Sequence, residues 1–186
     1  MNKPVLAAMS ALMMTLSLPL MAQETPHAGY RETGSERAWI GIYSPDRGLE
    51  QPTASCAIYS RPVNASVFEQ DRPVEALRGE LAAFIAWNGD GVSDTRGEIS
   101  FLIGAPVQEG RHELHGVTVG ETRFQLVGVG DRLYVQPEDD AAAVKALRGG
   151  TEMVVTAQTA DGKVVKDSYS LMGVQSMTEI QKTECR

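Results

Sequence analysis

Apolar and polar residues alternate over many short stretches of this chain, which is typical of half-buried β-strands. The pattern predicts strands at residues 39–43, 53–60, 81–87, 98–104, 114–119, 122–129, 132–136, 153–160 and 163–171. Glycine comes first in the two-residue joints Gly120-Glu121 and Gly130-Asp131, as tight hairpins prefer, and Asp161-Gly162 marks a third hairpin. Residues 63–79 are charged and broken by proline, so a long irregular connection is predicted there.

Two short helices interrupt the strands. The first opens with Pro137 and three acids and closes with Arg148 before two glycines, which suits the helix dipole at both ends. The second follows Gly173 towards the C-terminus. This order predicts an all-β fold, mainly an antiparallel β-sandwich, with two short helices of which one is C-terminal. In the hairpin of residues 153–171 the alternation is mixed, so the pattern leaves open which face is buried.

The first 22 residues have the pattern of an export signal. Lys3 precedes an apolar run over residues 5–20, and small Ala22 occupies the predicted cleavage position. The run is shorter than the roughly 20 residues that span a bilayer, and an uncleaved anchor is the alternative. We predict a signal peptide at 1–22, a flexible polar leader at 23–37 and a single domain at 38–186. The expected location is periplasmic or secreted and surface-associated, without membrane insertion after cleavage.

The chain is acidic, with a formal net charge of −7. Cleavage of the signal would remove one charged residue, Lys3, and bring the mature chain to −8. A negative surface repels nucleic acid and anionic lipid, so neither is an expected partner.

Cys56 and Cys185 are the two cysteines of the chain. In an exported protein such a pair is most simply one disulfide, while two free thiols or an intermolecular bridge are the alternatives. Catalytic redox pairs usually have a Cys-x-x-Cys spacing, which these residues lack. We therefore predict one structural disulfide that fastens the C-terminal helix to the second predicted strand.

The connection between the third and fourth predicted strands is the best candidate for an interaction site. It is long and rich in Asn, Asp and Gly, and binding residues concentrate on loops of this kind. The candidate residues are Asn88, Asp90, Asp94 and Arg96. Calcium is not predicted, because the oxygen-bearing residues do not follow the spacing of a twelve-residue calcium loop. A solvated hairpin tip is the alternative, since turns need the same residue types.

His112 and His115 flank Glu113, which invites a zinc-site interpretation. Residues three apart on a strand point to opposite faces, and the sequence places no third ligand nearby, so we predict exposed histidines and no metal. The Gly-x-Ser-x-Gly marker of one hydrolase class is absent from the sequence. These observations favour a non-enzymatic protein without a cofactor.

Several segments, taken in order, resemble the invasion-associated locus B (IalB) family of small exported proteins, known chiefly from alphaproteobacteria. The segments are Ala38–Tyr43, Cys56, Arg78-Gly79, Glu98–Val107, Phe124–Leu126, Leu147–Val155, Asp167–Gly173 and Cys185. The resemblance implies a β-rich periplasmic or surface-associated fold and an association with host-cell invasion in some pathogens. It implies no catalytic residues.

The expected function is that of an exported, non-enzymatic binding or accessory protein of the bacterial envelope, whose partner is an envelope or host protein. A periplasmic carrier that holds a small apolar ligand between its sheets is the first alternative. An unrecognised hydrolase is the second.

Overall fold

A computed structural model describes residues 31–44, 55–88 and 91–185 of this protein. The predicted signal peptide and the first part of the predicted leader lie outside these residues. The strands are β1 (Arg31–Glu36), β2 (Trp39–Ser44), β3 (Ser55–Ser60), β4 (Asn64–Glu69), β5 (Arg72–Val74), β6 (Ala82–Asn88), β7 (Glu98–Leu102), β8 (Gly116–Val119), β9 (Thr122–Val129), β10 (Arg132–Val135), β11 (Glu152–Gln158) and β12 (Val164–Ser170). The helices are the 3-10 turn η1 (His112–Leu114), α1 (Asp140–Gly149) and α2 (Val174–Glu184).

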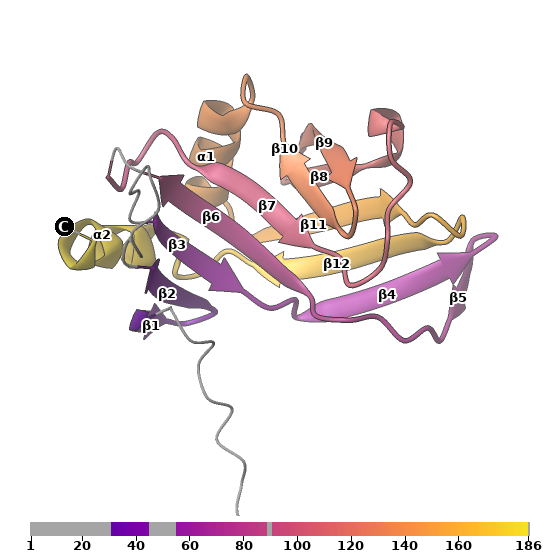
Figure 1. Ribbon diagram of the computed structural model, residues 1–186, viewed down its shortest axis with the longest axis horizontal. Coiled ribbons are helices and arrows are strands. Elements are labelled where there is room, and N and C mark those ends of the chain that lie inside the picture. The colour runs from indigo at the N-terminus through magenta and orange to yellow at the C-terminus, as the bar shows by residue number, and fades with distance from the viewer. Residues whose placement is uncertain (1–30, 45–54, 89–90, 186) are drawn as a thin grey trace, which may run out of the picture.

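The strands form two layers that share one strand. Their hydrogen-bonded order is β1-β2-β3-β6-β7-β10-β9-β8-β11-β12-β4-β5, and the pairs are antiparallel. In β9 the residues from Leu126 onward pair with β10, whereas Thr122 to Gln125 pair with β8 in the other layer. Figure 1 shows β6 and β7 crossing in front of β11 and β12. The predicted antiparallel sandwich with two helices is confirmed.

The core fills the space between these layers. Along β3, β8 and β11 every second side chain is buried. Its largest fully buried side chains include Trp39, Ile58, Ile85, Phe101, Leu126, Leu133, Met153 and Tyr169. Burial of each such side chain contributes about 1.5–3 kcal/mol, so this core accounts for most of the favourable free energy of folding.

The hairpin of β11 and β12 has a charged residue on its buried face. Its inward residues are Met153, Val155 and Ala157 on β11 and Val165, Asp167 and Tyr169 on β12. The joint at Asp161-Gly162 is confirmed, with Gly162 at a φ of 86°. The mixed alternation in the sequence arises because the carboxylate of Asp167 occupies a position that the apolar pattern would fill.

The predicted irregular connection at 63–79 is wrong in its first half, which forms the β4–β5 hairpin. Gln70 and Asp71 both have positive φ, 49° and 61°, as a two-residue type I′ turn requires. In β4 one residue, Val67, is buried, because this hairpin projects beyond the core at one end of the molecule (Figure 1). A strand with so few buried residues has no apolar period for sequence reasoning to detect.

The predicted flexible leader is also wrong for residues 31–37, because β1 pairs with β2 along the sheet edge. Arg37, with a φ of 56°, turns the chain between them. The Thr33 hydroxyl donates a hydrogen bond of 2.6 Å to Gln181 Oε1 on α2. The charged residues that suggested a tether face solvent, while α2 covers the other side.

Helix α1 begins at Asp140, three residues after the predicted opening at Pro137. Its inner face buries Ala143, Val144 and Leu147, as the helical period predicts for the first and last of these. The helix ends where the Gly150 N–H donates to the Ala146 carbonyl. In Figure 1, α1 covers one end of the sandwich beside β7.

Helix α2 begins after Gly173, which has a φ of 107°. A Cβ atom at this position would lie 2.1 Å from the Glu36 carbonyl oxygen, so glycine is required by space as well as by conformation. The helix packs on β1, β2 and β3 (Figure 1). Gln181 is fully buried there and donates to the carbonyls of Ile42 (3.0 Å) and Ala57 (2.6 Å).

The predicted disulfide is confirmed. Cys56 on β3 is bonded to Cys185, directly after α2, with a Cα–Cα distance of 6.1 Å. The two cysteines are 129 positions apart in the sequence. Among the described residues, none of the helices has the length and apolar character of a membrane span.

Candidate functional site

The loop between β6 and β7 is held against the body of the fold. Its described part, residues 91–97, is termed the clamped loop. It leaves the end of the sheet next to α2, so both helices are within reach of its side chains (Figure 1). The hairpin predicted around it is confirmed by the register of Ala86 with Glu98.

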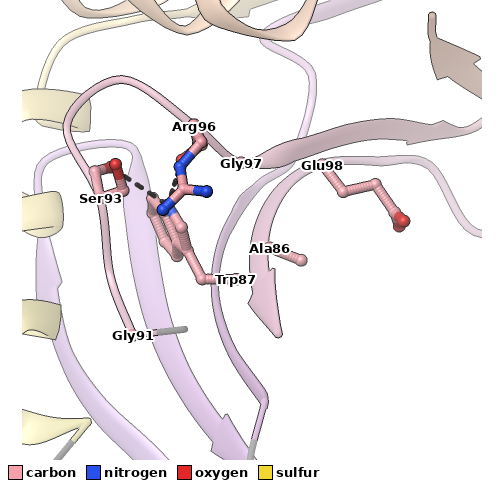
Figure 2. A pocket seen from close by; sticks show the side chains of 7 residues that line it. All are labelled: Ala86, Trp87, Gly91, Ser93, Arg96, Gly97 and Glu98. Atoms are coloured by element: carbon pink, nitrogen blue, oxygen red, sulfur yellow. Dashed lines mark hydrogen bonds between the residues drawn. The ribbon is translucent and has the colours of Figure 1, made fainter. Parts of the chain in front are cut away.

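Trp87 fixes the loop from below. Its indole is 5% exposed, and its Nε1–H donates to two loop carbonyls, Ser93 (3.1 Å) and Arg96 (2.6 Å). Figure 2 shows the indole lying beneath these two residues. A Cβ at Gly97 would come within 2.9 Å of the Ile85 side chain, so the loop approaches the sheet closely at its end. One indole N–H thus ties down the loop backbone at two points.

Asp94 fixes the loop from the side. Its carboxylate pairs with Arg148 on α1, and its Oδ2 lies 2.5 Å from Lys182 Nζ on α2. Glu179 joins the network, 3.4 Å from Arg148 Nη2 and 3.0 Å from Lys182 Nζ. The hydrogen bond from Lys182, together with the positive charge of Arg148, lowers the pKa of Asp94, so this carboxylate stays ionised. Asp94 therefore joins the loop to both helices.

Two surface hollows flank the clamped loop. The smaller, termed the indole hollow, has a volume of about 150 Å³ and is bordered by Trp87, Arg96 and Glu98 (Figure 2). The larger, termed the helix hollow, has a volume of about 470 Å³ and lies between the loop and α1. Its lining residues are Asp94, Thr95, Ala141, Ala142, Lys145 and Arg148. The loop is thus a fixed ridge with a concave surface on either side, and such surfaces suit the recognition of a ligand or a partner side chain.

The four predicted loop residues have different positions. Asp94 is the centre of the ion-pair network, and Arg96 offers its carbonyl to Trp87. Asn88 ends β6, where its backbone pairs with Ser55. Asp90 lies outside the described residues.

Sequence reasoning missed the residues that hold the loop. Arg148 and Lys182 follow Asp94 by 54 and 88 positions, so no local motif connects them. The apolar strand that contains Trp87 predicts that its side chain is buried, but it does not show which groups accept its N–H. A tryptophan directly before an Asn/Asp/Gly-rich loop is the one signal that could have suggested an anchor.

The two histidines have separate environments. His112 is exposed as predicted, but His115 is fully buried, which corrects the expectation that both face solvent. His115 Nε2 donates to the Gln108 carbonyl at 2.8 Å, and Nδ1 accepts from the Gln158 N–H at 3.4 Å. Both ring nitrogens are hydrogen-bonded to backbone groups, so His115 links the connection that contains Gln108 to β11. Over residues 31–44, 55–88 and 91–185 no cluster of three or more potential ligands is placed to hold a metal ion.

A second polar cluster lies inside the fold. Arg78 Nη1 donates to Asp167 Oδ2 at 2.8 Å and Nη2 to Oδ1 at 2.5 Å, with the side chains 7% and 0% exposed. Arg78 also donates to the Ile103 carbonyl at 3.3 Å. The nearby hydroxyl of Tyr169 is buried, with no hydrogen-bond partner among the described residues. Burial, and then the negative charge of Asp167, raise the pKa of Tyr169, so it remains a neutral phenol.

The backbone around Arg78 explains how a charged side chain enters the core. The Gly79 N–H donates to the Gly104 carbonyl at 2.7 Å. A Cβ at Gly104, where φ is 69°, would lie 2.8 Å from the Gly79 backbone. These two glycines let the connection before β6 lie directly on the chain after β7, which aims Arg78 inward at Asp167. The arrangement is one of structural support.

Comparisons with models of protein families, with curated proteins and with solved structures gave no match to this chain.

Proposed function

We propose that this protein is an exported, non-enzymatic binding or accessory protein of the bacterial envelope, of the kind that its resemblance to the IalB family implies. Its clamped loop and the two adjoining hollows would bind an envelope or host protein. The observation that carries this proposal is the fixation of Asp94 by both helices beside open hollows. A loop that is already ordered loses little conformational entropy on binding, so its contacts translate more fully into affinity.

The composition of the helix hollow supports a protein partner. Ala141 and Ala142 offer a small apolar surface, and the Lys145 side chain stands at its rim. Apolar surface with a few charged groups at the edge is what interface centres present to a partner side chain.

The packing of the interior favours this surface over a carrier function. A carrier of an apolar ligand needs space between its sheets, but Trp39, Phe101 and Tyr169 belong to the core there and have no exposed surface. The rings of Phe101 and Tyr169 have centroids 6.3 Å apart, so they contact each other directly.

A site-directed crosslinking experiment tests the binding proposal. A photo-crosslinking amino acid at exposed Thr95, in protein expressed in its own host, is expected to capture one dominant envelope or host protein. The same group at Glu121, in the turn between β8 and β9, serves as the control position. Equal products from both positions, or none from Thr95, would contradict the proposal.

A pair of charge reversals sharpens that experiment. Lys145→Glu alters the rim of the helix hollow, whereas Lys166→Glu alters an exposed lysine on β12 in the other layer. We expect the first substitution to reduce the Thr95 crosslink by roughly tenfold, the effect of losing about 1.4 kcal/mol of affinity, and the second to leave it unchanged.

Export is tested separately by fractionation of cells. The expected mature protein begins at Gln23, and its N-terminal sequence can be read from the periplasmic or extracellular fraction. Recovery of the intact chain from the cytoplasm alone would remove the exported part of the proposal.

A further inference from the structure

The disulfide joins the two anchors of the clamped loop. Cys56 stands directly opposite Trp87 in the β3–β6 ladder, and Trp87 holds the loop backbone from below. Cys185 follows Lys182 by three residues, at the end of α2, and Lys182 holds Asp94 from the side. The disulfide therefore fixes the position of Lys182 relative to β6, the strand that carries Trp87.

The last turn of α2 depends on this bond more than the rest of the helix does. Up to Gln181 the helix is held by buried Met177 and by the hydrogen bonds of Gln181 to β2 and β3. Beyond Gln181, the contacts with the rest of the fold include the surface network of Lys182, the exposed pair of Glu184 with Arg31 at 3.4 Å, and the disulfide. Exposed ion pairs alone hold a helix end weakly, because solvent screens them and helix ends fray.

We infer that the redox state of the Cys56–Cys185 bond regulates the clamped loop, a regulation that rests on the binding function proposed for that loop. In the oxidised protein, the final turn of α2 is fixed and Lys182 stays at Asp94. In the reduced protein, the turn frays, Asp94 keeps only Arg148, and the loop loosens. The binding surface is then ordered in an oxidising compartment and disordered by reduction.

The chemistry is a thiol–disulfide exchange with a dithiol reductant. A thiolate of the reductant attacks Sγ of Cys185, the more exposed of the two cysteines, and Cys56 leaves as a thiolate that takes up a proton. The second thiol of the reductant then resolves the mixed disulfide and releases Cys185. The protein gains two electrons and two protons, and the reductant becomes a disulfide.

The two tryptophans provide a test that needs no partner. The indole N–H of Trp87 is bonded to the clamped loop, whereas that of Trp39 donates to the Ser170 carbonyl at 2.9 Å in the body of the fold. Indole hydrogen exchange is measured by NMR on the full mature chain, before and after reduction with dithiothreitol. We expect reduction to accelerate exchange at Trp87 by about tenfold and to leave Trp39 within about twofold.

A variant of Lys182 tests whether reduction of the disulfide loosens the clamped loop through this residue. Lys182→Met keeps the apolar stem and removes the ammonium group, so in the oxidised variant Trp87 should already exchange several-fold faster. Reduction of this variant should add less than about twofold. The reduced wild-type protein should give a correspondingly lower yield of the Thr95 crosslink.

Three results would overturn the inference: an unchanged Trp87 rate after reduction, an equal acceleration at Trp39, or a full reduction effect in Lys182→Met. Equal acceleration would mean that the disulfide stabilises the whole fold rather than the loop. A missing Thr95 crosslink in both redox states bears on the binding function instead, because the indole rates are measured without a partner.

Discussion

Arg78 and Asp167 form a two-pronged ion pair inside the sandwich, with Nη1–Oδ2 and Nη2–Oδ1 distances of 2.8 and 2.5 Å. The pair joins the connection before β6 to β12 in the other layer. Removal of one partner would leave the other charge buried and alone, which costs far more than the pair itself contributes.

Arg78→Ala is therefore expected to lower the free energy of unfolding by about 3–5 kcal/mol, measured by urea denaturation. Arg78→Lys should recover only part of this loss, because an ammonium group cannot form the paired hydrogen bonds of a guanidinium. Arg111→Ala is the matched control, since its ion pair with Glu113 is exposed on both sides, and it should leave stability nearly unchanged. Similar effects at both arginines would contradict this interpretation.

Asp140 makes stability depend on pH. Burial of this carboxyl at the start of α1, followed by the charges of Glu98, Asp139 and Glu138, raises its pKa from 3.8 to about 6. Between these values the folded state holds a proton that the unfolded state has lost, so stability falls as pH rises from about 4 to about 6. Asp140→Asn should remove this fall, and its stability should exceed that of the wild type above pH 6 and match it near pH 3.5.

Asp161 serves as a control, because its effect on stability depends on pH in the opposite direction. Its hydrogen bond from Lys163, and then one from Thr159, lower its pKa to about 2. Stability from this group is present above pH 4 and is lost as pH falls towards 2, so Asp161→Asn should be less stable than the wild type above pH 4 and match it near pH 2. Denaturation curves at half-unit pH steps separate the two carboxyls. Parallel pH profiles for Asp140→Asn and the wild type would refute the assignment to Asp140.

Gly173 is expected to tolerate no side chain. Gly173→Ala should destabilise the protein by more than about 1 kcal/mol, because its φ is positive and the new Cβ would meet the Glu36 carbonyl. Gly149→Ala, near the end of α1, is the matched change in open space, and helix propensity predicts a gain of up to about 1 kcal/mol there. In thermal denaturation, the midpoint temperature should fall below that of the wild type for Gly173→Ala and rise above it for Gly149→Ala.

His115 is expected to be structural and His112 dispensable. His115→Ala would leave the Gln108 carbonyl and the Gln158 N–H without partners and open a cavity, at a cost of about 2–4 kcal/mol. His112→Ala, on the exposed turn η1, should stay within about 0.5 kcal/mol of the wild type. Equal costs in chemical denaturation would show that the ring contacts of His115 contribute little.

The elements that could be predicted from the sequence are those whose own residues carry the signal. The bounds of β9 agree with the prediction, because buried Phe124 and Leu126 alternate with polar Arg123 and Gln125. The joints at Gly120 and Gly130 were recognisable because each needs a positive φ, and both have one. In these elements the local sequence alone is enough to predict the observed structure.

The elements that could not be predicted depend on distant partners. β4 is a strand because β12, about a hundred residues later, pairs with it through Val67↔Val165 and its neighbours. Asp167 is buried because Arg78 reaches it, and neither residue alone predicts the other. The clamped loop shows the same limit: its composition indicated an exposed tip, while its fixation comes from α1 and α2.

The strand order has a consequence for the time course of folding. The first-made strands β1, β2 and β3 are covered by α2, the last of the described elements, and β4 waits for β12 to complete its ladder. Contacts between such distant segments form slowly, because a long stretch of chain must be closed before they can add stability. A partly made chain would therefore expose the apolar face of its early strands. Such a chain depends on being kept from aggregation until its final helix has emerged.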